Sequence, residues 1–598
     1  PSRSSAASDV YKRQIITLAF CFFIFDSGIA QINKISEELK AKIDSTYTSL
    51  LKKNKVTGTS IAIVDNGEIV YATGYGFSDL ENEKKADANT IYGIGSITKA
   101  FTALSVMQLQ EQEKLKVTNS IKDYLVDLDI ENPFNDGNQI YINDILSHTS
   151  GLPSDVINGF FVDNPPAISW AIKELNKQRM ISPRQYTWAY SNVGYGLLGE
   201  LISRVSGVTY GDYLKQNIFT PLNMTSSSIG YELSNTSKTY DGKKQTKEPS
   251  IRDEAAGFMS SNVIDMSNFI TMLISDGSFN TKQIIAANSL AEMEKDQLTN
   301  VLLASPYAYG YALDLDSIKI KNIKKNDSTV VSLIGHGGDT HAFHADFGYL
   351  PELKVGAVIL TNSVNGGSIN SASKLLKIYL ENAKNMEVDL DYSSPMSYKG
   401  TTPKDDEILG KYNLAQFIID VKDINKIKIK QGLSKLILKK KSNSNNYTAK
   451  AWIFGIIPKK MKGQEFKFEK LNNEIYVKQV YTKSKKEYYI GKKKTAHLPI
   501  PDSWKSMYGK YELTGEIYTA KDHTAWDISD VKMTVSEKNG VLKIDIKSKS
   551  ILNFSFYFDI ISDTSAVLGG VGRGTGGVAR ILENGNLYYS GFEFSKTK

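Results

Sequence analysis

One short segment constrains the fold of this chain more than any other, because a serine and a lysine stand at the start of an apolar helix. The segment is Gly93-Ile94-Gly95-Ser96-Ile97-Thr98-Lys99, and residues 100–107 after it are apolar nearly all round. A helix of this kind is normally buried at the centre of its domain. Ser96 and Lys99 are three residues apart, so they share one face at the helix N-terminus. The pattern predicts a polar pair inside a large core.

Such a pair suits an acyl-enzyme nucleophile. Helix N-terminal N–H groups stabilise negative charge, burial disfavours an ammonium, and the lysine lies within reach of the hydroxyl. A lysine with its usual pKa of about 10.4 cannot take a serine proton at neutral pH. Lys99 is therefore expected to be desolvated or hydrogen-bonded as a neutral amine. Ser-x-x-Lys also arises by chance, and the Gly-x-Ser-x-Gly elbow is absent because Ile94 and Thr98 occupy its glycine positions.

Three further segments lie downstream of this pair. They are Leu146-Ser147-His148-Thr149-Ser150-Gly151-Leu152-Pro153, Tyr190-Ser191-Asn192-Val193-Gly194-Tyr195-Gly196 and Gly335-His336-Gly337-Gly338-Asp339. Together with the first segment they resemble the family of serine β-lactamases, D,D-peptidases, D-aminopeptidases and related esterases. The resemblance covers residues 31 to about 385. It implies an α/β plus all-α domain, in which helices flank an antiparallel sheet, and a hydrolase that needs no cofactor and no metal.

The resemblance also implies the roles of particular residues. Its motifs fall on Ser96 and Lys99, on Tyr190 and Asn192, and on His336, Gly337 and Gly338. Lys99 and the phenolate form of Tyr190 would share the deprotonation of Ser96, and Tyr190 would then protonate the leaving group. Asn192 would orient the substrate amide. The backbone N–H groups of Ser96 and Asp339 match the family's oxyanion hole.

The third motif departs from that of class C β-lactamases, which have Lys-Thr-Gly where this chain has His336-Gly337-Gly338. Without the lysine ammonium, recognition of a substrate carboxylate is weakened. Short peptides or amides with a D-residue are therefore expected first, D-alanyl peptidoglycan stems second, and small esters or β-lactams third. Two alternatives stay open: a penicillin- or cell-wall-fragment-binding protein with little turnover, and a carbohydrate-binding role for the C-terminal domains alone.

Histidines cluster near the third motif. His336, His341 and His344 fall within nine residues, and Asp346 follows them. A zinc site is the competing interpretation. Against it, the family motif already explains His336, and in an extended segment positions 336 and 344 face opposite to 341.

Strand patterns stand at both ends of the first domain. Residues 57–75 alternate around the turn Asp65-Asn66-Gly67, which predicts a β-hairpin. Residues 97–275 are helical and loop-rich, and strands return at 346–350 and 355–362. One antiparallel sheet built from both ends of residues 31–387 is therefore expected.

Beyond a predicted linker at 388–407, nearly all the sequence has strand character. Leu409-Gly410-Lys411-Tyr412 is echoed by Tyr508-Gly509-Lys510-Tyr511. Two similar all-β, barrel-like domains are expected, at 408–500 and 501–598.

Two features of these β domains allow a functional interpretation. In the first domain, Lys426, Lys428 and Lys430 alternate with isoleucines, which predicts a solvated strand face or a weak attraction to an anionic envelope polymer. In the second, Gly572, Gly574 and Gly577 have the spacing of a dinucleotide-binding loop but no helix after them. D-aminopeptidases of the family have a last-barrel loop that reaches the active site, and the resemblance assigns residues 569–577 to that loop.

The N-terminal segment predicts export, to the periplasm or the outside. Residues 1–10 show no apolar periodicity and are set aside, and residues 1–30 as a whole precede the first domain. Tyr11, Lys12 and Arg13 precede an apolar run at 15–25, and small residues end it at 27–30, which is the order of a signal peptide. Eleven residues fall short of the about 20 that a membrane-spanning helix needs. The only cysteine, Cys21, lies in this run, and 72 basic against 65 acidic residues do not imply nucleic acid.

Overall fold

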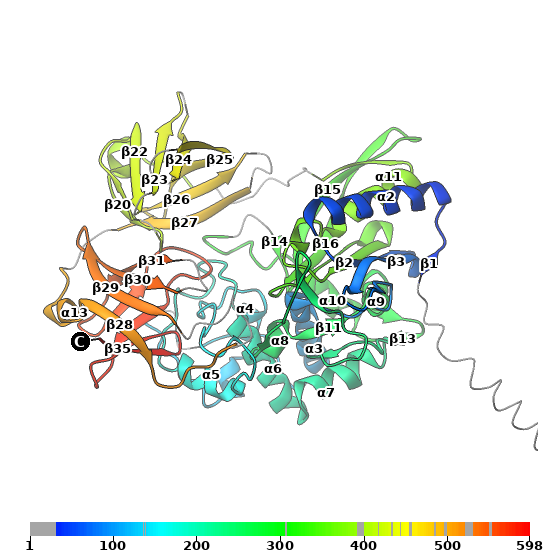
Figure 1. Cartoon of the computed structure of the whole chain (residues 1–598), viewed down its shortest axis with the longest axis horizontal. Coiled ribbons are helices and arrows are strands. Elements are labelled where there is room, and N and C mark those ends of the chain that lie inside the picture. The colour runs from blue at the N-terminus through cyan, green and yellow to red at the C-terminus, as the bar shows by residue number, and fades with distance from the viewer. Residues whose placement is uncertain are drawn as a thin grey trace, which may run out of the picture.

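The computed structural model describes residues 31–597, apart from 135–136, 138, 305–307, 391–399, 417, 432–433, 443, 454–456, 483–485, 495–498, 521–529 and 549–552. The apolar run at 15–25, with Cys21, lies outside the described residues. Within them, no helix has the length and apolar content that crossing a membrane requires. Figure 1 shows an α/β domain and two β domains.

A ten-stranded antiparallel sheet is the framework of the first domain. Its main path runs β1-β3-β2-β18-β17-β16-β15-β14, with β4 on β3 and β19 on β15. The N-terminal hairpin lies beside the C-terminal strands, because β2 pairs with β18 from Thr59↔Thr361 to Asp65↔Val355. The expectation of one sheet built from both ends is confirmed. Its strands are β1 Ile32–Asn33, β2 Gly58–Asp65, β3 Glu68–Asp79, β4 Lys84–Lys85, β14 Ala308–Tyr309, β15 Asp314–Asn322, β16 Asp327–Asp339, β17 His344–Leu350, β18 Val355–Thr361 and β19 Met386–Asp389.

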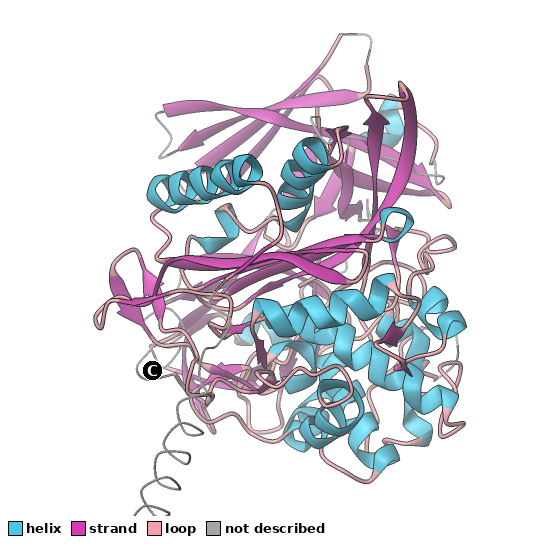
Figure 2. Ribbon diagram, turned by 90° about the vertical axis from the view of Figure 1, so that its right-hand side faces the viewer, coloured by secondary structure: helices cyan, strands magenta, loops and turns pink. Residues whose placement is uncertain are grey.

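Helices cover both faces of this sheet, as Figure 2 shows. On one face, α2 (Glu37–Asn54) and α11 (Ala372–Ala383) pack on Ile61 and Ile63 of β2. On the other face, Ala62 and Val64 join the larger core of the helical region. Because side chains alternate along a strand, a strand buried on both faces carries a continuous apolar run, and in β2 this run is Ile61-Ala62-Ile63-Val64.

The helical region surrounds one central helix, α3 (Thr98–Glu111), which is buried from Thr98 to Leu109. Its buried hydroxyls are satisfied, since Thr102 contacts Tyr210 Oη at 2.7 Å and Ser105 donates to the Phe101 carbonyl. The predicted buried helix is therefore present. The other helices of this domain are α4 Ile142–Leu146, α5 Ile168–Leu175, α6 Asn192–Ser206, α7 Tyr210–Leu214, α8 Glu254–Gly257, α9 Val263–Ile274 and α10 Ala287–Met293.

The sequence interpretation missed the long hairpin of β15 and β16. Residues 327–330 of β16 are exposed, so they lack the apolar alternation that indicates a strand. The third motif lies at the end of β16, where Asp339 pairs with His344 of β17. The assumption of one extended segment through the histidines was wrong, because a hairpin turn separates 336 from 344.

Both C-terminal domains are antiparallel meanders. The first is an eight-stranded sheet in the order β21-β20-β27-β26-β25-β24-β23-β22, and the second is a closed eight-stranded barrel, so the expected β-rich domains are confirmed. Strand β19, at 386–389, extends into the segment that was predicted as linker. The helices and strands of the two C-terminal domains are α12 Asp405–Ile408, β20 Gly410–Asn413, β21 Ile418–Val421, β22 Lys426–Gln431, β23 Ser434–Lys440, β24 Asn446–Ile453, β25 Ile457–Leu471, β26 Glu474–Tyr481, β27 Lys486–Lys493, α13 Asp502–Ser506, β28 Gly509–Thr514, β29 Lys532–Lys538, β30 Val541–Lys547, β31 Phe554–Ile560, β32 Ser565–Leu568, β33 Val578–Ile581, β34 Leu587–Tyr589 and β35 Phe592–Lys596.

The four-residue echo is a repeated structural device. In each domain a short helix is followed by a glycine with positive φ and then by a buried tyrosine on the first strand. Tyr412 donates to the Ile408 carbonyl at 2.8 Å, and Tyr511 donates to the Met507 carbonyl at 2.7 Å. The tyrosine hydroxyl thus satisfies a carbonyl at the end of the preceding helix in both domains.

The lysine-rich strand is β22. Ile427 and Ile429 are buried in the core of the first β domain, whereas Lys426 and Lys428 are exposed. These positions form the solvated strand face that the alternation predicts.

We expect Tyr511→Phe to destabilise the second β domain by about 1 kcal/mol, because a buried carbonyl loses its partner. The measurement is the free energy of unfolding of that domain in urea. Tyr508→Phe is the matched control, since its hydroxyl bonds Glu537 at the exposed surface. An equal effect of both substitutions would contradict the role given to the buried hydroxyl.

Candidate active site

Ser96 and Lys99 meet at the start of the central helix. Ser96 lies in the 3-10 turn η1 (Gly95–Ile97), and Lys99 lies in the first turn of α3. The Lys99 side chain is completely buried. Its Nζ lies 3.1 Å from Ser96 Oγ, 2.9 Å from Asn192 Oδ1 and 2.6 Å from the Ala256 carbonyl oxygen.

These three contacts fit a neutral amine. Asn192 Oδ1 and the Ala256 carbonyl can only accept, so they take the two N–H groups of an uncharged Lys99. The lone pair is then left for the third neighbour, the Ser96 hydroxyl, which can donate. Burial holds the pKa of Lys99 well below its usual value, and the nearby Arg573 guanidinium lowers it further.

The Asn192 amide is oriented by Asp155, which lies on the side opposite to Lys99. Asn192 begins α6, and its Nδ2 donates to Asp155 Oδ1 at 2.8 Å. A carboxylate oxygen on that side turns the amide oxygen toward Lys99. Burial raises the pKa of Asp155. The sequence interpretation missed Asp155, although it lies two residues after the segment 146–153 that was singled out.

Tyr190 lies against the same pair. Its ring centroid is 4.7 Å from Lys99 Nζ, and its hydroxyl is hydrogen-bonded with Ser96, which lowers the pKa of Tyr190. Burial is the larger effect and raises that pKa above its usual value. The phenol is therefore protonated in the free protein. This disfavours the phenolate that the family resemblance implied and leaves the Lys99 amine as the better base.

His148 supports the Tyr190 ring, a role that the sequence did not indicate. The two ring centroids are 4.1 Å apart. The Ser191 backbone N–H donates to His148 Nδ1 at 3.1 Å. Burial holds the pKa of His148 well below its usual value, so the ring is neutral. It fixes the phenol and the start of α6 together.

Two glycines allow the first and third motifs to touch. Gly95 has φ +51°, and a Cβ there would lie 2.7 Å from the Asp339 nitrogen. A Cβ on Gly338 would lie 1.9 Å from the Ile94 carbonyl oxygen and 3.0 Å from the Ser96 nitrogen. The end of β16 therefore lies directly against the backbone of the serine turn. This is the arrangement that the expected oxyanion positions, Ser96 and Asp339, require.

His336 lies at the edge of this group. Its ring centroid is 6.5 Å from that of Tyr190, and Nε2 lies 3.3 Å from Tyr309 Oη. Burial lowers the pKa of His336, so the ring is neutral. His344 bonds Asp339 instead of sharing a centre with His336. Over the described ranges, no three His, Cys, Asp or Glu side chains converge as metal ligands.

The glycine loop of the last domain reaches the site, as the resemblance to D-aminopeptidases implied. The Gly574 N–H donates to Ser154 Oγ at 2.9 Å. The Arg573 guanidinium lies 4.7 Å from the centroid of the Tyr190 ring. The sequence interpretation identified the loop at 569–577 but missed its arginine, which is the only charged side chain between these glycines.

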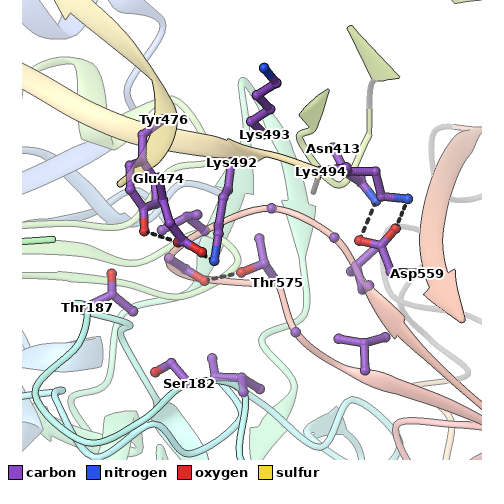
Figure 3. Close-up of a pocket in the computed structure, with 18 of the residues that line it drawn as sticks. Ser182, Thr187, Asn413, Glu474, Tyr476, Lys492, Lys493, Lys494, Asp559 and Thr575 are labelled. Atoms are coloured by element: carbon purple, nitrogen blue, oxygen red, sulfur yellow. Dashed lines mark hydrogen bonds and ion pairs between the residues drawn. The ribbon is translucent and has the colours of Figure 1, made fainter. Parts of the chain in front are cut away.

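A cavity of about 700 Å³ lies where this loop meets both other domains. Figure 3 shows Glu474, Tyr476 and Lys492 at one end and the Lys494–Asp559 ion pair at the other. Loop residues 569–572, 575 and 576 line it, whereas Arg573 does not. Ser96, Lys99, Tyr190, Asn192 and His336 are also absent from its lining, so the cavity is separate from the serine site.

A family model described as Beta-lactamase matches residues 43–378, which is more than half of the chain. Protein flp of Staphylococcus aureus strain MW2 is 25% identical over 346 residues, covering 55% of this chain and 64% of its own length. PbpX of Bacillus subtilis strain 168, whose name places it among penicillin-binding proteins, is 30% identical over 267 residues, covering 42% and 63%. The chain thus spans less than two thirds of the length of these relatives.

Solved structures show the same fold. A penicillin-binding protein homologue from Pyrococcus abyssi, described as octameric, has a TM-score of 0.50 and 23% identity, covering 76% of this chain and 99% of its own. SurE has a TM-score of 0.54 and 16% identity, with the same coverage. The covered share exceeds residues 43–378, so the likeness of fold extends into the β domains.

We expect Gly338→Ala to slow labelling of Ser96 by a fluorophosphonate probe by about 100-fold or more, because the new methyl group drives β16 away from the serine turn. Gly337→Ala is the matched control. Its Cβ would meet no atom closer than 3.8 Å. Labelling rates of both variants are compared after circular dichroism shows that both are folded. Equal rates would contradict the close-approach argument.

Proposed function

The chain belongs to the Beta-lactamase family of serine β-lactamases and penicillin-binding-protein-like hydrolases, and on that premise we propose that it is an exported serine hydrolase. It forms an acyl-enzyme on Ser96 and cleaves amide or ester bonds, with peptides that contain a D-residue as its first substrate class. No metal or cofactor takes part in the proposed steps.

One observation carries this proposal: a completely buried lysine amine lies 3.1 Å from a serine hydroxyl. Two obligate acceptors hold the N–H groups of Lys99, as the distances to Asn192 and Ala256 show. A surface lysine after a capping serine, which is the chance form of this motif, would be exposed and charged. Lys99 is completely buried instead, and burial holds its pKa well below the usual value, which favours the uncharged amine.

The steps of the proposed reaction follow from the contacts. Ser96 Oγ attacks the substrate carbonyl carbon while its proton passes to Lys99 Nζ, 3.1 Å away. The N–H groups of Ser96 and Asp339 stabilise the oxyanion. Tyr190 then donates its proton to the departing nitrogen or oxygen and is reprotonated from the Lys99 ammonium. Water cleaves the acyl-enzyme by the reverse sequence of proton transfers.

The other residues of the site hold this geometry. Asn192 fixes the amine and faces the substrate amide, and His336 lies beside Tyr190 as a neutral ring. Gly337 and Gly338 leave room at the strand edge where the substrate binds. Export rests on the N-terminal sequence alone, since residues 1–30 lie outside the described chain.

The decisive experiment labels the protein with a fluorophosphonate or a fluorescent penicillin. We expect a label on the wild type that is absent in Ser96→Ala and clears with time, because the acyl-enzyme is hydrolysed. A label that persists would instead support a penicillin- or cell-wall-fragment-binding protein. A panel of D-amino acid anilides, short nitrophenyl esters and a chromogenic cephalosporin ranks the substrate classes. No label on any form would contradict the proposal.

The pH dependence of kcat/KM tests which group is the base. Lys99 must be neutral to act, so kcat/KM rises with pH through the pKa of Lys99, which burial places well below 10.5. Tyr190 must stay protonated, and its raised pKa moves any alkaline decline above pH 10. Lys99→Arg is always charged and should lose about 10²- to 10⁴-fold in rate. A profile that stays flat into the acidic range would contradict a lysine base.

A further inference from the structure

Arg573 has no partner for its charge among the described residues. Its side chain is exposed, and it forms no hydrogen bond or ion pair with any residue of the described ranges. Four other arginines of the described residues differ in this respect, whereas Arg179 contacts the Phe134 ring. Arg184, Arg204, Arg252 and Arg580 each pair with a carboxylate at 2.7–2.8 Å. Arg573 is thus an exposed guanidinium beside the nucleophile's site whose charge no described carboxylate pairs.

The loop that carries Arg573 is held in place. Gly572 and Gly574, on either side of it, have φ of +90° and +72°, a conformation that side chains rarely adopt. Gly574 is tied to Ser154, and Thr575 Oγ1 donates to the Gly572 carbonyl at 2.7 Å. Gly576 packs on Ile181 so closely that a Cβ would lie 2.4 Å from the isoleucine Cβ. These contacts thus fix the backbone on both sides of Arg573.

Among the residues that the structure describes at the site, the Arg573 guanidinium is the cation left to bind a substrate. Lys99 uses its amine on Ser96, Asn192 and Ala256. At the third motif, this chain has the neutral ring of His336 where class C β-lactamases have a charged lysine. Asp155 is near, but its carboxyl accepts from Asn192 Nδ2 and forms no ion pair with Arg573 within the described chain.

We propose that Arg573 binds a carboxylate on the leaving group of the substrate and so determines which bond this hydrolase cleaves. The inference rests on the proposed hydrolase function. Tyr190 delivers the proton to the leaving atom, and the guanidinium covers the Tyr190 ring at 4.7 Å. A carboxylate one carbon away from the leaving nitrogen or oxygen therefore lies toward Arg573. A guanidinium fork matches a carboxylate with two parallel hydrogen bonds.

The preferred substrate is then a chain whose last residue leaves with a free carboxylate. A substrate that places a free ammonium at this position is disfavoured, because it meets a like charge. The cation that the strand motif lacks is supplied by a loop of a different domain.

The test uses two ester substrates with the same acyl group. In one the leaving group is a 2-hydroxy acid with a free carboxylate, and in the other that carboxylate is a carboxamide. Arg573→Gln removes the charge, Arg573→Lys keeps it, and Lys428→Gln removes one exposed charge far from the site. The readouts are kcat/KM on both esters and the rate of labelling by a neutral fluorophosphonate.

We expect the wild type to prefer the carboxylate ester. Arg573→Gln should lose about 10- to 100-fold more on that ester than on the carboxamide or in labelling, because any change in the pKa of Lys99 affects all three rates alike. Arg573→Lys should retain part of the preference, and Lys428→Gln all of it. An equal loss on both esters, or a wild type without preference, would overturn the inference while labelling at Ser96 still supports the hydrolase. Absence of labelling in the wild type would overturn both.

Discussion

The buried Lys99 amine is the interaction on which the rest of the site depends. An ammonium at that position would have to leave water without an opposite charge beside it, which is far more costly than burying a neutral amine. The contacts of Nζ come from three segments that are distant in sequence: the serine turn, the start of α6 and α8. Each must be in place for the amine to be satisfied. The packing of the helical core therefore also determines whether Lys99 can act on Ser96.

The last domain is attached to that core through polar contacts beside the site. Tyr588 bonds Glu174 and Gln178, and Arg580 donates to the Lys177 carbonyl. Asn158 Nδ2 donates to the carbonyls of Glu516 and Gly591. Figure 1 shows this barrel against the helices α4 and α5. Because Ser154 and Asp155 lie in the same segment as Asn158, the surface that holds the barrel also orients Asn192.

Local patterns in the sequence predicted the parts of the fold that have a strong period or a rigid motif. The apolar helix after Ser96, the sheet from both ends and the two β domains indicated by the four-residue echo are of this kind. The hairpin of β15 and β16 was missed because its outer half is exposed and its inner half is rich in glycine. Asp155 was missed because it belongs to none of the recognised motifs. Arg573 could not be predicted as a site residue, because only the docking of the barrel places it beside the Tyr190 ring.

The position of Arg573 places the charge that a substrate meets on a different domain from the groups that react. The nucleophile, base and proton donor belong to the core around α3, whereas the guanidinium belongs to a barrel with its own hydrophobic core around Trp504. A change in the loop at 569–577 alters the charge that a substrate meets without touching the contacts of Lys99. In a strand motif with lysine, charge recognition and the oxyanion backbone share three adjacent residues. Here Gly338 of β16 provides the close approach to Ser96, and the proposed charge recognition lies on another domain, where it is free to vary.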